Sequence, residues 1–385
     1  MTAPLDDAQA IRRAGCDLLS LALIDSRNHL LRLLAIDESG AALRIAVQAG
    51  WYQDHWIARH VQRQRGEACD PRAPRLAGIE PRADTWAAGE GDPPTPEALR
   101  GYLAETLEVT LDLLSGTPET DTALHFYRSS LLHEDRLCEA LVERLQAGAP
   151  PARAERAPLW WPAQRWLLGT AGDGPHGAQV RGLVPHNERW AHEVAVPEFE
   201  IDAQPVNWAR FVEFADDSGY DRRELWTDAG WAWAQAEGRR APRHVEQLQG
   251  GVLVQRGLGK ASAMQRAPAG QAVMHVSRFE AQAWCAWAGR RLPFEPEWEL
   301  AAASGASRGF VWGDVFEWVA GSARAWADAG DAAPGSLDRI PPPGTHGVLR
   351  GASFATRKRL AYPKARRFAP PGRDTMFCGF RSCAL

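Results

Sequence analysis

The sequence predicts two parts, a helical bundle followed by an α+β domain with much irregular structure. Leucines recur at helical spacing in the first part, whereas 14 of the 17 tryptophans lie at or beyond Trp160. A stretch rich in Pro, Ala and Arg (146–158) separates the two compositions. We therefore expect a four-helix bundle over 1–148, a linker over 149–159 and the irregular domain over 160–385.

Four amphipathic helices are expected in the first part. The apolar positions place them at 8–36, 43–63, 95–114 and 121–145. The third has the clearest start, because the hydroxyl of Thr95 precedes a proline at the first helical position and an acid in the first turn. Residues 65–94 would form one long crossover, an arrangement known in four-helix bundles.

The second part shows short β-like runs at 193–201 and 252–255, which Gly and Pro interrupt. One helix is expected at Ser277–Ala288, where Ser277 and Glu280 have the spacing of a capping box. The 35 glycines and many tryptophans indicate aromatic packing between irregular segments.

Bulk properties limit the classes of partner. The net charge is −4, so no general positive field would attract nucleic acid. The longest apolar run, around Leu18–Ile24, is far short of the roughly 20 residues that span a membrane. The acidic start has no apolar signal core, and the six cysteines form no CxxC pair. We expect free thiols and a cytoplasmic protein.

Ordered segments of the second part resemble formylglycine-generating enzymes. They are HNERWAHEVAVPEFEIDAQPVNWARFVEFADDSGY (186–220), FEAQAWCAWAGRRLPFEPEWELAAA (279–303), GDVFEW (313–318), VLRGASFAT (348–356) and CGFRSCAL (378–385). The resemblance implies a C-type-lectin-like domain of the sulfatase-modifying-factor type.

Two segments of the first part narrow the resemblance. GWYQDHWIARHVQRQRG (50–66) and FYRSSLLHEDRLCEALV (126–142) are similar to the DinB-like bundle of ergothioneine sulfoxide synthases and selenoneine synthases. The resemblance implies an iron- and oxygen-dependent enzyme that joins sulfur or selenium to the imidazole of a histidine derivative. Its iron(II) would lie between the bundle and the second domain, together with a thiol or selenol co-substrate.

The family's three iron ligands are one histidine on the second helix and an H-x-x-x-H pair on the fourth. His133 matches the first residue of the pair, but Leu137 occupies the second position and Gln48 replaces the remaining histidine. An amide oxygen is a weak ligand and leucine has no donor atom. His55 and His125 lie about two turns from the positions they would have to replace, roughly 10–12 Å away.

The substrate side also departs from the family. Arg367 stands where the family has asparagine, while Phe368 keeps the aromatic position. Arg136, Arg367 and Arg373 are candidate substrate-binding residues in an interdomain cleft that would favour anions. The expected catalytic tyrosine is missing, since 319–347 contains none.

The resemblance implies two further candidate metal sites. Asp314 and Glu317 of GDVFEW could supply oxygen ligands for a structural calcium ion, or could simply form a turn. The copper-binding branch uses two late cysteines, but 357–373 contains none, so Cys378 and Cys383 are expected to be buried.

Three functions follow as alternatives. The first is an iron-dependent synthase of ergothioneine or selenoneine type. The second is a metal-free homologue that binds a small histidine-, thiol- or selenol-type ligand, or an intact paralogue. The third is an enzyme with rewired, metal-independent chemistry. Iron content would separate the first from the others.

Overall fold

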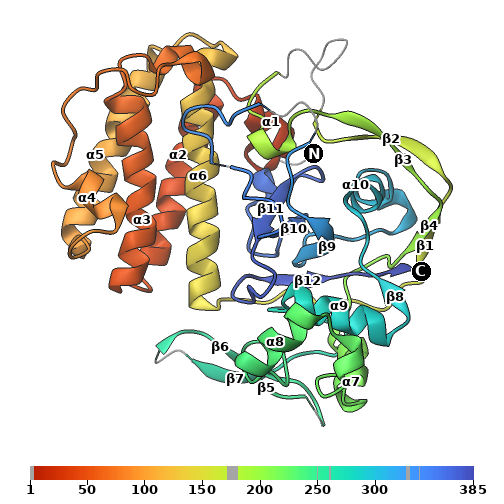
Figure 1. Ribbon diagram of the computed structural model, residues 1–385. Helices are drawn as coiled ribbons and strands as arrows, with labels where there is room; N and C mark the ends of the chain where they lie inside the picture. The colour runs from red at the N-terminus through yellow and green to blue at the C-terminus, as the bar shows by residue number, and fades with distance from the viewer. Residues whose placement is uncertain (1–3, 171–180, 249, 260–261, 327–329, 338) are drawn as a thin grey trace.

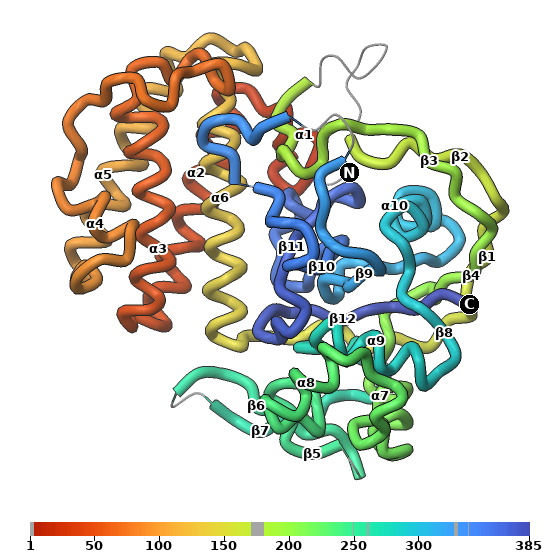
Figure 2. The backbone as a smooth tube through the Cα atoms, in the orientation of Figure 1, coloured from red at the N-terminus to blue at the C-terminus, as the bar shows by residue number. Residues whose placement is uncertain are grey.

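The computed structural model describes residues 4–170, 181–248, 250–259, 262–326, 330–337 and 339–385. Figure 1 shows the helices of the first part standing beside the short strands and helices of the second. Helix α6 (Asp121–Leu145) is the bundle helix that faces the second part in both views of the backbone (Figures 1 and 2).

The bundle contains four long helices. They are α2 (Cys16–Leu34), α3 (Gly40–Gln53), α5 (Pro96–Ser115) and α6. Both α2 and α3 pack against α5 and α6, around a core that includes Leu30, Val47, Leu99, Leu103 and Leu141. Thr95 caps α5 as expected, since its hydroxyl accepts a hydrogen bond from Ala98 N at 3.2 Å.

The first predicted helix is wrong in its extent, because 8–36 holds two helices, α1 (Ala8–Arg12) and α2. The helix is interrupted before Cys16. At Gly15, an added Cβ would clash with the Glu119 carboxylate. That carboxylate accepts a hydrogen bond from Cys16 N at 2.7 Å and so takes the place of a local N-cap.

The second predicted helix is shorter and less regular than expected. Helix α3 ends at Gln53 and continues as one turn of π-helix, Asp54–Ala58. Such turns often occur at functional sites. The crossover also contains a short helix, α4 (Ala83–Ala88).

The described residues of the second part hold two four-stranded sheets. One has the order β1 (Leu159–Trp161), β4 (Phe199–Ile201), β13 (Cys383–Ala384) and β8 (Arg290–Arg291). The other has the order β11 (Arg366–Ala369), β10 (Gly347–Arg350), β9 (Phe316–Ser322) and β12 (Cys378–Phe380). Only the β12–β9 pair is parallel among these strands.

Smaller elements complete the second part. Two smaller sheets pair β2 (Gln164–Leu168) with β3 (His192–Val196), and β6 (Leu253–Arg256) with β5 (Val245–Gln247) and β7 (Ala263–Arg266). The helices are α7 (Trp208–Asp216), α8 (Asp228–Ala236), α9 (Arg278–Trp287) and α10 (Glu295–Ser304). Short 3-10 turns occur at Pro4–Asp6, Arg63–Ala68, His186–Glu188, Arg223–Leu225, Ala306–Arg308 and Lys358–Leu360.

The expected mixed α and β character of the second part is confirmed. Ser277 and Glu280 form the predicted capping box, with Ser277 N donating to Glu280 Oε2 at 2.7 Å. Four tryptophans are almost fully buried, namely Trp208, Trp284, Trp298 and Trp318. Aromatic side chains therefore fill much of the space between the short strands and helices.

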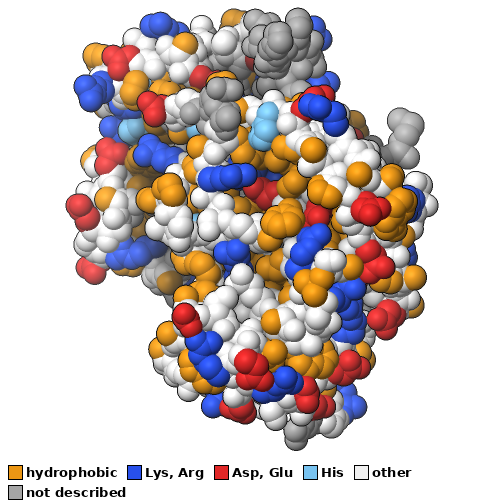
Figure 3. Space-filling view, turned by 45° about the vertical axis from the view of Figure 1, so that its right-hand side comes forward, with side chains coloured by type: hydrophobic (Ala, Val, Ile, Leu, Met, Phe, Trp, Pro, Cys, Tyr) orange, Lys and Arg blue, Asp and Glu red, His pale blue; other side chains and the backbone are white. Residues whose placement is uncertain are grey.

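The surface adds little that is specific. In the described part of the chain, no helix is both long and apolar enough to cross a membrane. Acidic and basic side chains alternate over the face seen in Figure 3.

Candidate functional site

Helix α6 joins the two parts through buried carboxylates. Asp135 binds the Arg359 guanidinium through two hydrogen bonds of 2.6 and 2.8 Å. One turn further, Glu139 pairs with Arg367 and accepts a hydrogen bond from the Ser353 hydroxyl at 3.0 Å. Charges from the bundle and from the second domain thus neutralise each other along one helix face.

A second buried ion pair fixes α6 within the bundle. Arg27 of α2 donates to both oxygens of Glu134 at 2.8 and 2.9 Å. The same guanidinium donates to Gln53 Oε1 at 2.9 Å, where α3 gives way to the π-helix. These contacts hold α2, α3 and α6 together around the expected ligand positions.

The three expected iron-ligand positions do not form a metal site. The His133 ring lies 5.2 Å from the ring of Tyr52, and Gln48 donates its amide to Ala87 O of α4 at 2.7 Å. Leu137 packs against the apolar core of the bundle. Within the described residues, no three His, Cys, Asp or Glu side chains are placed to hold one ion. These residues do not fit iron coordinated by three nitrogens.

His55 and His125, the two histidines about two turns from expected ligand positions, contact aromatic rings. His55 stacks on Trp51 with ring centres 4.6 Å apart, and burial lowers its pKa to about 4. His125 contacts Phe126 edge-on and lies 3.7 Å from Glu67. Burial also lowers the pKa of His125 to about 4, so both imidazoles are neutral at pH 7.

Acidic side chains lie close to two of the arginines expected to line the cleft. Arg367 pairs with Glu139 and lies 4.2 Å from the centre of the Phe316 ring. Glu143 lies near Arg367 and Arg373; burial, with a smaller effect of Glu139, raises the pKa of Glu143 to about 7. Acidic side chains therefore lie beside Arg367 and Arg373, and the anion-favouring cleft stays a prediction.

The remaining candidates for substrate binding are dispersed. Phe368 is half-buried in β11, opposite Val348 of β10. Arg373 donates to the Thr375 hydroxyl at 3.3 Å, and Arg136 is half-buried on α6. No ligand role of these residues is tested by the structure, and their substrate-binding role stays a prediction.

The two carboxylates considered for calcium are bound by arginines. Asp314 receives hydrogen bonds from Arg153 at 2.6 and 2.8 Å. Glu317 accepts from Arg381 at 2.8 Å and from the indole of Trp298 at 2.9 Å. The calcium site stays a prediction, although these oxygens already have positively charged or donor partners.

A small pocket between the two parts was not predicted from the sequence. It has a volume of about 30 Å³ and is lined by Glu67, His125, Ser129, Leu132, Leu183, Val184, Pro185, His186, Arg189, Ala333, Ser336 and Leu337. Nε2 of His125 is buried without a hydrogen-bond partner in this structure. The sequence signal that could have revealed its wall is the Pro334-Gly335 pair, a strong turn former.

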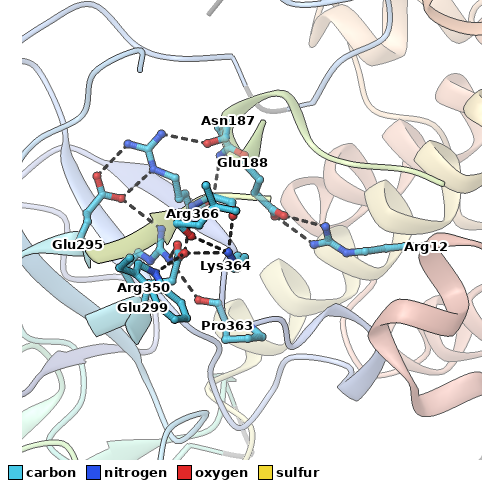
Figure 4. A network of polar contacts seen from close by, with 12 residues as sticks. Arg12, Asn187, Glu188, Glu295, Glu299, Arg350, Pro363, Lys364 and Arg366 are labelled. Carbon is cyan, nitrogen blue, oxygen red and sulfur yellow. Dashed lines mark hydrogen bonds and ion pairs between the residues drawn. The ribbon is translucent and has the colours of Figure 1, made fainter. Parts of the chain in front are cut away.

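The segment His186–Glu188 shows how the second domain holds the N-terminal helix. Glu188 binds Arg12 of α1 at 2.7 Å, and Asn187 O accepts from Arg366 at 3.0 Å (Figure 4). Arg366 also binds both oxygens of Glu295, at 2.8 and 3.0 Å. A connected set of charges thus runs from α1 to the β10–β11 sheet edge and to α10.

The chain is similar in sequence to several known proteins. The sulfatase-modifying factor enzyme 1-like domain matches residues 168–334. The hercynine oxygenase of Mycolicibacterium smegmatis is 32% identical, over 74% of this chain and 77% of its own length. That of Mycolicibacterium thermoresistibile is 29% identical over 94% of both chains. An inactive C-alpha-formylglycine-generating enzyme 2 of Mus musculus is 36% identical over 41% of this chain and 49% of its own.

Proposed function

The chain belongs to the hercynine oxygenase family, and we propose that it is a metal-free member that binds a small histidine-type ligand between the bundle and the second domain. The observation that carries this proposal is the state of the three expected ligand positions. The Gln48 amide donates a hydrogen bond to Ala87 O, and Leu137 has no donor atom. The His133 ring packs against the ring of Tyr52. Similarity along nearly the full length supports a retained ligand cleft.

The surroundings favour binding over three-nitrogen iron chemistry. The imidazoles of His55 and His125 are neutral, and each packs against an aromatic ring. Aromatic faces and neutral polar groups are typical of small-molecule sites. Tyr52 supplies such a face beside His133, and Trp56 and Phe126 supply two more near Tyr52, with their rings stacked at 5.1 Å.

The proposal is tested by calorimetric titration of hercynine, the compound that names the relatives, into protein prepared with a strong chelator. We expect saturable binding with metal content well below one ion per chain. L-Histidine and a structurally unrelated amino acid of the same charge serve as competitors that measure selectivity. Absence of hercynine binding in the chelated protein, with binding restored by iron(II) under anaerobic conditions, would overturn the metal-free proposal.

The second candidate is an iron- and oxygen-dependent synthase of ergothioneine or selenoneine type, in which sulfur or selenium is joined to the imidazole. It is favoured by the similarity to hercynine oxygenases across both parts of the chain. Metal analysis of protein expressed with iron supplied anaerobically decides between the two. About one tightly held iron per chain that is lost in His133→Ala would support the synthase.

A further inference from the structure

One segment of the second domain contacts aromatic side chains of the bundle. Residues 333–336 form a β-turn in which Ser336 N donates to Ala333 O at 3.0 Å. Gly335 has φ +72°, a conformation that the third residue of a type II turn requires and glycine adopts readily. In Figures 1 and 2 the blue segment 330–337 passes across α6 toward the bundle.

The turn fits closely against three aromatic rings. Tyr52 Oη donates to Gly335 O at 2.8 Å. A Cβ added to Gly335 would lie 2.8 Å from Phe126 Cε1, 3.1 Å from Tyr52 Oη and 3.3 Å from Trp56 Cδ2. The turn therefore occupies the space above these rings, with no room for even one more methyl group.

The space left beside the turn is too small for a metabolite. Ala333 and Ser336 help to line the interdomain pocket, whose volume of about 30 Å³ is roughly the share of one water molecule. Small-molecule sites usually enclose about 300–1,000 Å³. A ligand of histidine size can enter only if a wall of the pocket moves.

The turn, Ala-Pro-Gly-Ser over 333–336, carries no charged side chain and therefore forms no side-chain ion pair. Residues 332–337 are all half-buried and belong to no helix or strand. The opposite walls are α6 and the segment 183–189, which are held by ion pairs such as Glu134–Arg27 and Glu67–Arg189. Displacing the turn would therefore break far fewer strong interactions than moving α6.

We propose that the turn 333–336 is a gate that closes the interdomain cleft, with the Tyr52–Gly335 hydrogen bond as its latch. This inference rests on the proposed function only for the identity of the ligand. Because Tyr52 also contacts the His133 ring, the latch connects the gate to the one imidazole kept at the expected ligand positions. Binding would then require the open form. The smaller the fraction of open protein, the weaker the measured affinity would be.

The gate is tested first without any ligand. Val184 is buried and lines the pocket, so Val184→Cys provides a thiol that a small maleimide reaches only when the cleft opens. In this background we expect Gly335→Ala to speed modification of the new thiol about tenfold, since its methyl group clashes with the aromatic rings. The parent chain, which carries the six natural cysteines, gives the labelling to be subtracted.

A matched control separates the clash from backbone strain. Gly344 has a similar φ of +78°, but nothing lies within 4 Å of an added Cβ, so Gly344→Ala strains the backbone without touching the rings. Labelling should stay at the parental rate in this variant. Equal rates in the two alanine variants would overturn the gate.

The latch is tested with Tyr52→Phe, which removes the hydroxyl but keeps the ring against His133. Thiol labelling should accelerate, and the Kd for hercynine should fall about two- to tenfold, since the hydrogen bond that joins the bundle to Gly335 O is lost. Faster labelling without hercynine binding in any variant leaves the gate standing and overturns the proposed ligand. Hercynine binding with unchanged labelling does the reverse.

Discussion

The buried carboxylates of the second domain and the expected ligand positions of the bundle differ in the partners that they have. In the second domain, Glu317 keeps a buried partner in Arg381, and Glu299 keeps one in Arg350. In the bundle, Gln48 and Leu137, which the resemblance places at two histidine positions, donate to Ala87 O and pack against the apolar core, respectively. The contrast indicates that the residues which build the fold do not depend on a metal-binding cleft.

The comparison predicts its largest effect inside the second domain. Glu317→Ala should lower the free energy of unfolding by about 3–5 kcal/mol, because it leaves the Arg381 charge buried without its partner. Urea denaturation measures this loss. The exposed pair Arg165–Glu193 provides the control, and Arg165→Ala should cost at most about 1 kcal/mol. A similar cost for both variants would contradict the distinction between interior and surface.

Restoring the ligand set should reverse the difference between the two regions. The double variant Gln48→His, Leu137→His supplies the two missing imidazoles, and we expect its iron(II) affinity to rise at least about 100-fold over the parent. That increase corresponds to roughly 3 kcal/mol. Anaerobic titration followed by metal analysis measures it. Each single variant is the control, since one added histidine leaves the set incomplete; no gain in the double variant would show that the cleft geometry itself has changed.

The cleft should also respond to acid through His125. Its pKa in the folded protein is about 4, below the usual 6.5, so the folded state binds fewer protons than the unfolded state between these values. The stability that depends on neutral His125 is present above pH 6.5 and is lost as the pH falls toward 4. By pH 5 the loss should reach about 2 kcal/mol.

This pH effect is measured by urea denaturation at pH 7.5 and pH 5 in the parent and in His125→Gln. The variant should lose less stability than the parent over this interval. The comparison between variants is needed because Glu280 has the opposite effect. Burial raises its pKa to about 7, so its protonation makes the folded protein more stable as the pH falls. Parallel losses in both proteins would rule out His125 as the source.

The smallest effect is expected at Gln48 itself. Gln48→Ala removes one hydrogen bond to Ala87 O and should cost about 0.5–1.5 kcal/mol. It should leave iron content unchanged in protein expressed with iron. Differential scanning calorimetry and metal analysis check the two statements, and a fall in bound iron would identify Gln48 as a ligand.

Much of the fold follows from local sequence signals. The caps at Thr95 and Ser277 lie where the sequence predicts them, because capping depends on residues only three positions apart. The break at Gly15 could not be predicted in this way, since its cap comes from Glu119. The π-helical turn after Gln53 likewise has no simple local signature.

The site was harder to predict than the fold. The replacement of ligands at Gln48 and Leu137 stays a prediction from the sequence, which also presented Arg367 as a residue for binding an anionic substrate. Its partner, Glu139, is 228 residues earlier in the chain, and no periodicity connects them. The contact between Tyr52 and Gly335 spans 283 residues and is likewise a product of tertiary structure.

The carboxylates on one face of α6 also affect how the protein unfolds. Asp135 and Glu139 find their guanidinium partners in Arg359 and Arg367, beyond the linker that marks the change in composition. A fragment cut at that linker would carry a row of uncompensated carboxylates on a newly hydrated surface. The two parts that differ in composition should therefore unfold together, and the intact chain should melt in a single transition.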